Sequence, residues 1–237
     1  MTHVDTRGSE LEISFLKIAR EISAQINRGD VLGLGSGSTV ARFANVLGNR
    51  VSEESLKISV IPSSMQAWLL AQENRLSTEY DFAHCPAEID LAVDGADQIG
   101  VANRSMIKGG GGALLREKII LSSAKKSYIL GDWKKFVRKL DRSVPVEVIQ
   151  FASFNLEQKI RKNFGAKAEL RKLDKGYPFY TESGNIILDC QFSDPIEDPV
   201  RLEKELKLLP GVVEVGVFNS KIDRFYKAKD DESFEII

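Results

Sequence analysis

The segment Val31-Leu32-Gly33-Leu34-Gly35-Ser36-Gly37-Ser38-Thr39 indicates the fold class of this chain. Its first four residues are apolar or glycine and predict a short buried strand. The next five combine glycines with hydroxyl side chains, and apolar residues spaced three or four apart follow as far as Gly48, which predicts a helix. A strand that passes through a glycine-rich turn into a helix is the repeating unit of α/β proteins.

The alternation of strand and helix continues on both sides of this stretch. A helix with apolar residues from Leu11 to Ile26 precedes it, with Ser9 and Glu12 as a capping box and Gly29 as a C-terminal stop. Further along the chain, the pattern predicts strands at 58–61, 91–93 and 128–130 and helices at 65–73 and 112–123. This order predicts a Rossmann-like, mostly parallel, doubly wound sheet with helices on both faces.

The pattern changes near Pro145. Beyond it we expect helices at 156–164 and from Pro199 to about Pro210, and strands at 146–151, 168–173, 179–182, 186–192 and 212–218. A βαββαβ-like order predicts a second, smaller ferredoxin-like α+β domain. The predicted organisation is a Rossmann-like catalytic domain of residues 1–144 plus 220–237, and a small α+β domain of residues 145–219.

Composition and charge narrow the class of protein. The 33 Lys and Arg oppose 34 Asp and Glu, so the net charge of −1 argues against a general nucleic-acid or membrane-surface binder. Two cysteines, Cys85 and Cys190, cannot build a disulfide framework, which favours a reducing, cytoplasmic location. No apolar run is long enough to span a bilayer. With His3 and His84 as the two histidines, a histidine-rich metal site is excluded, and catalysis must depend on carboxylates, lysines, hydroxyls and backbone dipoles.

The first candidate site is the loop Gly35-Ser36-Gly37-Ser38-Thr39. Ligands of a doubly wound sheet bind beyond the carboxyl ends of the strands. Free amides at the start of the next helix, together with the hydroxyls, suit a phosphate monoester. The loop is not a P-loop, and counting G-x-G-x-x-G from Gly33 puts Ser38 at the sixth position. The alternative is a turn that only caps the helix.

The second candidate is Asp94-Gly95-Ala96-Asp97, directly after an apolar strand. Two neighbouring carboxylates repel each other and lose hydration unless a partner is present. A ligand rich in hydroxyl groups would supply the hydrogen-bond donors. A metal ion is the competing interpretation, although no His or Cys cluster supports it, and Asp97 could instead cap a turn.

The third candidate is Lys108 followed by four glycines, 109–112, and a helix that carries Glu117. Glycine amides beside a lysine form a pocket for a developing oxyanion. Glu117 lies on an apolar stripe with no Lys or Arg three or four residues away in the helix, which is costly unless the carboxylate is paired or used. The alternatives are an exposed glutamate or one paired with a distant lysine. Lys135, after strand 128–130, could reach the same cleft or be a solvated surface charge.

Taken together, these residues resemble the type A ribose-5-phosphate isomerases. The resemblance is carried by residues 35–39, 94–97 and 108–118, in the order of the family, with weaker matches at 144–148, 184–189 and 209–213. It covers most of the chain, from about the first helix to Phe218. Each motif is weak by itself, but three in the right order at predicted strand ends are specific.

The resemblance implies interconversion of D-ribose 5-phosphate and D-ribulose 5-phosphate without a metal or organic cofactor. Glu117 would be the general base that moves a proton between C2 and C1 through a cis-enediolate. Asp94 would assist ring opening, and Lys108 would stabilise the negative oxygen. The family suggests a homodimer or homotetramer. Residues expected to bind the substrate are Ser36, Gly37, Ser38, Thr39, Asp94, Gly95, Ala96, Asp97, Lys108, Gly109, Gly110, Gly111 and Lys135.

Three positions depart from the family pattern. Gln98 stands where a glutamate is usual, and Lys134 where a small hydroxyl residue is common. A first-helix lysine that often helps to bind the phosphate is replaced by Phe15, with Lys17 nearby. These departures could alter substrate preference.

Three other functions compete with isomerisation of ribose 5-phosphate. Another enzyme of similar fold is one, either a different sugar-phosphate isomerase or an acyl-CoA transferase with a Glu nucleophile, although Lys108 and the aspartate pair favour isomerisation. A non-catalytic sugar-phosphate sensor is the second, although the single helix before the phosphate loop is too little for a helix-turn-helix. A nucleotide-binding oxidoreductase is the third, and the imperfect glycine fingerprint argues against it.

Overall fold

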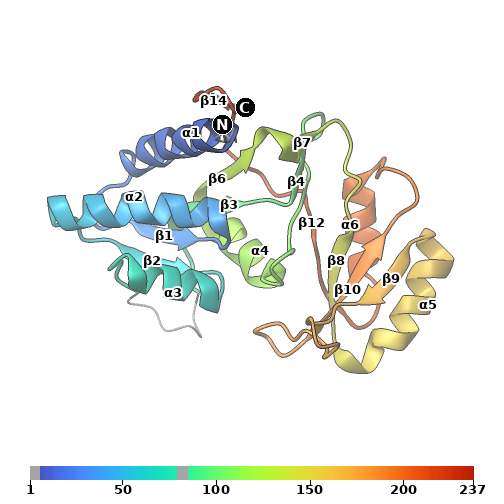
Figure 1. The fold of residues 1–237 in the computed structure, drawn as a ribbon. Helices are drawn as coiled ribbons and strands as arrows, with labels where there is room; N and C mark the ends of the chain where they lie inside the picture. The colour runs from blue at the N-terminus through green and yellow to red at the C-terminus, as the bar shows by residue number, and fades with distance from the viewer. Residues whose placement is uncertain (1–5, 79–84) are drawn as a thin grey trace. The chain divides into compact units, whose positions relative to one another are not determined.

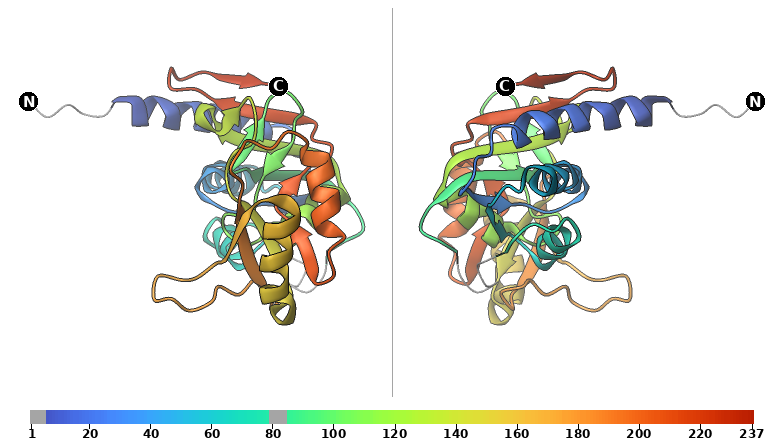
Figure 2. Two further views of the ribbon diagram at one scale, coloured as in Figure 1. Left: turned by 90° about the vertical axis from the view of Figure 1, so that its right-hand side faces the viewer. Right: turned by 90° about the vertical axis from the view of Figure 1, so that its left-hand side faces the viewer.

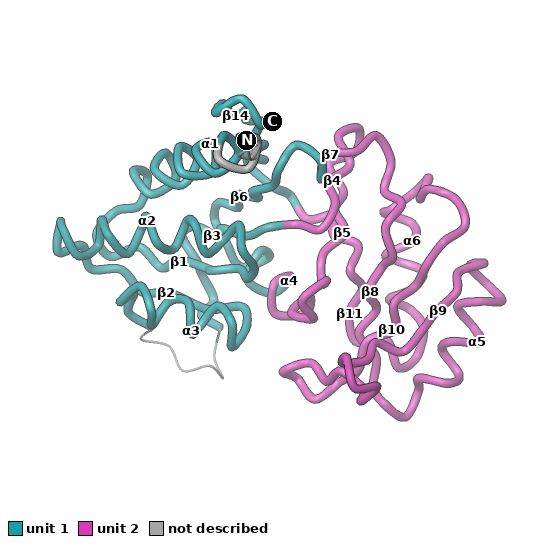
Figure 3. Tube along the Cα trace, viewed as in Figure 1, with its two compact units in different colours: residues 1–95, 119–136, 221–237 teal, residues 96–118, 137–220 magenta. Residues whose placement is uncertain are grey.

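The computed structural model describes residues 6–78 and 85–237, so His3 and His84 lie outside the described residues. Two compact units can be distinguished, coloured separately in Figure 3. Unit 1 comprises residues 1–95, 119–136 and 221–237, and unit 2 comprises residues 96–118 and 137–220. The domain boundaries expected at 144/145 and 219/220 remain a prediction about independently folding domains.

Unit 1 contains a six-stranded sheet in the order β14-β13-β6-β3-β1-β2 (Figure 1). All neighbouring strands from β13 to β2 are parallel, and β14 pairs antiparallel with β13 at the edge. This confirms the mainly parallel α/β sheet. The strands are β1 (Val31–Leu34), β2 (Ser59–Pro62), β3 (Ile89–Gly95), β6 (Ala124–Asp132), β13 (Arg224–Ala228) and β14 (Phe234–Ile236).

Helices pack on both faces of this sheet. On one face, Leu32 and Leu34 of β1 share a core with Phe15 and Phe43 from two of the helices. On the other face, a Cβ added at Gly33 would lie 2.4 Å from a methyl group of Ile120, so a glycine is needed for close helix packing. The helices are α1 (Thr6–Ser23), α2 (Ser38–Glu54), α3 (Met65–Glu73) and α4 (Leu114–Ser123).

The first helix differs in its start from the sequence-based expectation. Helix α1 already begins at Thr6, so Ser9 lies inside the helix and is not its N-cap. The capping-box pattern of Ser9 and Glu12 is therefore wrong as a boundary signal. Figure 2 shows α1 alongside the C-terminal strands β13 and β14, which it contacts although they lie at the other end of the chain.

Unit 2 contains an antiparallel sheet in the order β11-β8-β10-β9, with an apolar core between the sheet and two helices. The chain order β8–α5–β9–β10–α6–β11 is the βαββαβ order that the sequence predicts. That this part forms a separate ferredoxin-like domain stays a prediction. The elements are β8 (Val144–Val148), α5 (Ser153–Phe164), β9 (Lys167–Leu170), β10 (Ile186–Gln191), α6 (Pro199–Lys207) and β11 (Val212–Val215).

Several short elements depart from expectation. The strand expected at 179–182 is wrong, since Tyr180 forms only an isolated bridge with Ile186. The strand expected at 212–218 is interrupted at Gly216, where a Cβ would lie 2.5 Å from the carbonyl oxygen of Lys108. A further sheet in the order β12-β5-β4-β7 was not expected. The short elements are β4 (Gln98–Gly100), β5 (Met106–Ile107), β7 (Phe136–Val137), β12 (Val217–Phe218) and the 3₁₀ helices η1 (Trp133–Lys135) and η2 (Gln150–Ala152).

Glu214 of β11 is a buried carboxylate and gives unit 2 a pH-dependent term in its stability. Burial raises the pKa of Glu214, but hydrogen bonding to Lys207, the charge of Lys118 and the amide of Val215 together hold that pKa below its ordinary value of 4.5. A lowered folded-state pKa contributes stability above pH 4.5 that is lost as the pH falls through the folded-state value.

We therefore predict that Glu214→Gln is less stable than the wild type at pH 7 by roughly 2 kcal/mol, the scale of hydrogen bonds to a charged group. The deficit should shrink as the pH is lowered below 4.5, the ordinary value. Urea unfolding at a series of pH values measures it. A deficit that stays constant down to pH 3 (about 1.5 units below that value) would show that the ionisation of Glu214 is not linked to folding.

No helix within residues 6–78 and 85–237 combines the length and the apolar character needed to cross a membrane.

Candidate active site

The carboxyl ends of the parallel strands β1, β3 and β6 lie at one edge of the unit 1 sheet. The loop Gly35-Ser36-Gly37 connects β1 to α2, and Gly37 is the N-cap of α2 with φ 90°. Gly37 has no side chain that could cap the helix, so the cap residue itself offers no acceptor to the amides of the first turn. A helix start with this geometry is suited to an anion, as expected for residues 36–39.

Asp94 comes from the neighbouring strand β3 and lies against this loop. The amide of Gly35 donates to the carbonyl oxygen of Val93, at 2.9 Å, and the amide of Gly95 donates to Oδ1 of Asp94, at 2.7 Å. Asp94 is 3% exposed. The first two candidate segments are thus joined by strand pairing within unit 1.

Gly35 is required by the position of Asp94. A Cβ at residue 35 would lie 1.9 Å from Oδ1 of Asp94 and 2.8 Å from its Cα, and the backbone atom cannot rotate away. We predict that Gly35→Ala lowers the free energy of unfolding by about 1–3 kcal/mol, the scale of overpacking. Gly111→Ala is the matched control, because no atom lies within 4 Å of its added Cβ. Equal urea midpoints for the two variants would contradict the close approach.

Lys135 follows β6, the strand that pairs with β3 on the other side. It ends the 3₁₀ helix η1, which Asp132 caps by accepting a hydrogen bond from the amide of Lys134 at 2.9 Å. Lys135 therefore stands at the same edge of the sheet as the Gly35 loop and Asp94. Lys134 is exposed, and its ammonium group lies over the ring of Trp133.

In unit 2, Lys108 and Glu117 form a buried ion pair. Their Nζ and Oε2 atoms are 3.3 Å apart, and the residues are 3% and 5% exposed. Of the alternatives for Glu117, pairing with a distant lysine is the one found. Removing one partner of such a pair typically costs about 3–5 kcal/mol, because the other charge is left buried. Forming the pair contributes little net stability, because both charges lose their hydration, so a purely structural role explains the pair poorly.

Local structure brings both side chains into position. Lys108 directly follows β5, and its amide donates to the carbonyl oxygen of Gly216 at 2.9 Å. Glu117 lies in the first turn of α4, where the helix dipole favours a carboxylate. The helix begins at Leu114 instead of Gly112, which leaves the glycines as an irregular loop.

The glycine loop of residues 109–112 is held by residues from two other segments. Asp97 accepts a hydrogen bond from the amide of Gly110 at 2.8 Å, so its carboxylate holds the glycine loop from a distant part of the sequence. Arg171 donates to the carbonyl oxygens of Gly109 and Gly110, at 2.8 and 3.0 Å, and also pairs with Asp189. No local pattern pointed to Arg171, because it lies in the second part of the chain, far from the glycines.

Gln98 has a structural role that a glutamate could not fill. Its amide nitrogen donates to Oδ1 of Asp141 at 2.5 Å, and its oxygen accepts from the amides of Asp141 and Arg142. A glutamate here would place two carboxylates in contact. The glutamine that departs from the family pattern at position 98 is therefore explained by its hydrogen bonds with Asp141.

The departure in the first helix has a different structural outcome. Phe15 is a core residue, and Lys17 donates to the carbonyl oxygen of Glu232 at 2.6 Å. Arg42 of α2 lies over the ring of Phe15, at 4.9 Å, and donates to the carbonyl oxygen of Ser38 at 3.1 Å. A cation from α2 therefore lies beside the Ser38 end of the loop 35–39, and Arg42 also pairs with Glu12.

Neither metal-binding groups nor disulfides are found among the described residues. No three His, Cys, Asp or Glu side chains of this part of the chain are grouped to hold a metal ion. Cys85 is exposed and Cys190 is buried, both as free thiols. Burial raises the pKa of Cys190 to about 12, so this thiol stays protonated.

Comparison with known proteins gives one consistent family. Residues 59–232 match the family model described as ribose 5-phosphate isomerase A (phosphoriboisomerase A). A ribose-5-phosphate isomerase A from Archaeoglobus fulgidus is 44% identical, covering 87% of this chain and 89% of the relative. The Homo sapiens ribose-5-phosphate isomerase is 35% identical, covering 90% of this chain and 68% of the relative.

Solved structures agree with these sequence relatives. Ribose 5-phosphate isomerase A from Methanocaldococcus jannaschii has a TM-score of 0.86 and 35% identity, covering 94% of this chain and 97% of that one. A D-ribose-5-phosphate isomerase solved in complex with phospho-erythronic acid has a TM-score of 0.87 and 36% identity, covering 97% and 98%.

Proposed function

The chain belongs to the ribose 5-phosphate isomerase A family, and we propose that it interconverts D-ribose 5-phosphate and D-ribulose 5-phosphate with Glu117 as the general base. The single observation that carries the proposal is the buried Lys108–Glu117 pair, 3.3 Å between Nζ and Oε2. An aldose–ketose isomerase needs one base beside one cation, and this pair provides both groups.

The proposed reaction proceeds on the open-chain sugar. The Glu117 carboxylate removes the proton from C2, and the electron pair of that bond forms the C1–C2 double bond of a cis-enediolate. The Lys108 ammonium stabilises the negative charge that develops on the C1 oxygen. Glu117 then returns the proton to C1, which leaves the ketose. A positioned general base contributes about 10²–10⁴-fold to the rate.

The remaining residues bind the substrate in this proposal. Residues 36–39 hold the phosphate through backbone amides and hydroxyls, with Lys135 supplying positive charge. Asp94 assists ring opening and proton movement between the oxygens. Further sugar contacts come from residues 95–97 and 109–111. The parallel strand ends of unit 1 support the first group, and the hydrogen bond between Asp97 and Gly110 supports the last.

The ligand of one similar structure has a group for each of the two proposed binding regions, the phosphate site and the oxyanion site. Phospho-erythronic acid, present in that isomerase complex, carries a phosphate at one end and a carboxylate at the other. A carboxylate places two oxygens on one carbon and can occupy the positions of the enediolate oxygens. In this chain, residues 36–39 would bind the phosphate and Lys108 the carboxylate.

The proposed activity is tested by direct detection of ribulose 5-phosphate formed from ribose 5-phosphate in buffer treated with a chelator. We expect full turnover in this buffer, because the family resemblance implies catalysis without a metal. Binding of ribose 5-phosphate without any product would contradict the proposal and support a sugar-phosphate sensor. Parallel assays with other aldose phosphates distinguish a different isomerase of the same fold.

We also propose that the enzyme is a cytoplasmic homodimer or homotetramer. Exposed apolar side chains in η2 and in the first turn of α5 support self-association: Phe151 is 98% exposed and Phe154 is 74% exposed. A patch of this kind is a common feature of protein interfaces. Sedimentation equilibrium is expected to show an oligomer that Phe151→Ser weakens, and a wild-type monomer at micromolar concentration would contradict the proposal.

A further inference from the structure

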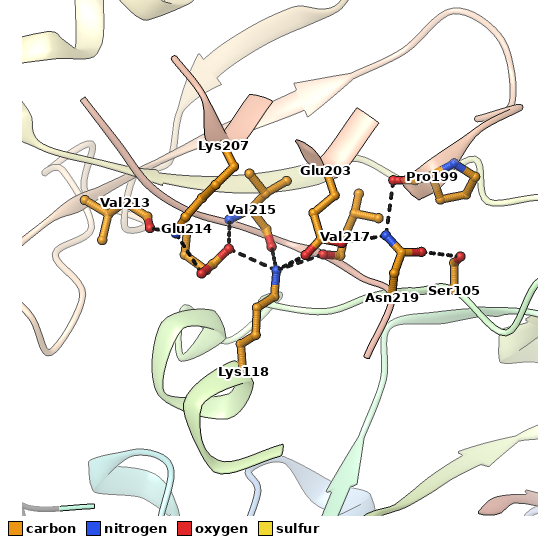
Figure 4. A network of polar contacts seen from close by, with 10 residues as sticks. All are labelled: Ser105, Lys118, Pro199, Glu203, Lys207, Val213, Glu214, Val215, Val217 and Asn219. Carbon is orange, nitrogen blue, oxygen red and sulfur yellow. Dashed lines mark hydrogen bonds and ion pairs between the residues drawn. The ribbon is translucent and has the colours of Figure 1, made fainter. Parts of the chain in front are cut away.

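Lys118, the residue after Glu117, lies at the centre of a buried polar network in unit 2 (Figure 4). Its ammonium group pairs with Glu203 at 2.6 Å and with Glu214 at 2.9 Å. It also donates to the carbonyl oxygens of Val215 and Val217, at 2.8 and 2.9 Å. Its side chain is 15% exposed. The three protons of an ammonium group are thus fully used, and the side chain is tied to one place.

Residues 214–217, which bind Lys118, also hold Lys108. The amide of Lys108 donates to the carbonyl oxygen of Gly216, which lies between the two carbonyl groups that accept from Lys118. Strand β12 pairs with β5, the strand that leads directly into Lys108. The ring of Phe218 lies under both lysines, 5.7 Å from Nζ of Lys108 and 4.5 Å from Nζ of Lys118. One segment therefore supports both members of the Lys108–Glu117 pair.

The network extends from Glu203 to the residue that precedes β5. Asn219 donates to Glu203 at 2.6 Å and accepts a hydrogen bond from Ser105 at 2.5 Å (Figure 4). A chain of polar contacts thus connects Ser105, at one end of the segment that carries Lys108, to Lys118 on the helix that carries Glu117. Buried networks with every member satisfied make local structure rigid.

Lys118 cannot act as a second partner of Glu117 from this position. Consecutive helix residues point about 100° apart around the axis. The ammonium group of Lys118 donates to acceptors of α6 and of residues 214–217, whereas Glu117 forms an ion pair with Lys108. Lys118 can therefore affect the reaction only by determining where the first turn of α4, which carries Glu117, is placed.

We infer that Lys118 is a positioning residue, which fixes the separation of Glu117 and Lys108 by anchoring α4 to the segment 214–219. This inference rests on the proposed function of Glu117. The two carboxylates that bind Lys118 and the backbone carbonyls beside Gly216 set the distance between the base and the oxyanion partner. The reacting groups themselves do not touch Lys118.

The test is a double-mutant cycle with Glu117→Gln. We expect Lys118→Met to lower kcat by roughly 10–100-fold, the cost of misplacing a reacting group by about 1 Å, with little change in KM. The acidic limb of the pH profile of kcat/KM should move as well, because the pair is disturbed. In the Glu117→Gln background, Lys118→Met should change kcat by less than about threefold, since coupled residues are not additive.

Two further variants separate positioning from folding. Lys118→Arg keeps the charge and should retain more activity than Lys118→Met. If circular dichroism shows that Lys118→Met does not fold, Lys118→Arg replaces it in the double-mutant cycle. Lys207→Met is the matched control, because Lys207 also binds Glu214, at 2.8 Å, and it should leave kcat unchanged.

The inference is overturned if Lys118→Met and Lys118→Arg both keep wild-type kcat, or if the losses of the two sites multiply in the double variant. Either result leaves Glu117 as the base, provided that Glu117→Gln alone is inactive. Near-normal turnover of Glu117→Gln would instead end the proposed function, and the positioning role with it.

Discussion

Glu117→Gln is expected to lower kcat by about 10²–10⁴-fold, the usual contribution of a positioned general base. Glutamine keeps the shape of the side chain and can still lie beside Lys108, but it cannot accept the C2 proton. KM for ribose 5-phosphate should change little, because we propose that residues 36–39, and not Glu117, bind the phosphate. Steady-state assays with purified protein measure both constants.

The matched control for Glu117→Gln is Glu53→Gln, which makes the same change at an exposed residue of α2. This control should have the kcat of the wild type. A Glu117→Gln enzyme with kcat within a few-fold of the control would remove Glu117 from the role of base. Loss of activity together with loss of the circular dichroism spectrum would show that the buried pair is needed for folding instead.

Lys108→Met is expected to produce the second large loss, roughly 10²–10³-fold in kcat, the cost of removing one oxyanion-stabilising donor. The variant also removes the cation that lies 3.3 Å from the Glu117 carboxylate. A buried carboxylate without its cation is harder to ionise, so the acidic limb of the pH profile of kcat/KM should shift to higher pH.

Lys134→Met makes the same change at an exposed lysine and should affect neither kcat nor the pH profile. Lys108→Arg is informative beside it, because the planar guanidinium keeps the charge but not the point geometry of the ammonium group. A Lys108→Met variant whose acidic limb stays in place, with a rate close to that of the control, would show that the pair is not part of the catalytic apparatus.

The sheet of unit 1 could be predicted from the sequence because its signals are local. Apolar strands such as Val31–Leu34 run directly into polar loops, and the helices carry apolar residues at regular spacing. The two-residue strands β5 and β12 could not be predicted, since they are too short to show a pattern and pair with each other across more than a hundred residues. Strand β5 also pairs with β4. Gly216 interrupts an apolar run for a similar reason, namely contact with Lys108 and Pro145.

The candidate site divides in the same way. Local sequence singled out the loop 35–39, Asp94 and the glycine loop as candidates, because glycines and carboxylates at strand ends are unusual. From the sequence, the ion-pair partner of Glu117 could be described only as a distant lysine. No local pattern indicated the contacts of Arg171 and Asp141 or the Lys118 network. Each of these depends on a contact between segments far apart in the chain, which spacing along the sequence does not encode.

A crystal structure of this protein with phospho-erythronic acid would show where each end of the ligand binds. We expect the phosphate on the amides and hydroxyls of residues 36–39, and the carboxylate within hydrogen-bond distance of Lys108, with Glu117 facing the carbon chain. A ligand bound away from residues 36–39, or a Glu117 side chain directed away from the bound acid, would contradict this proposed arrangement.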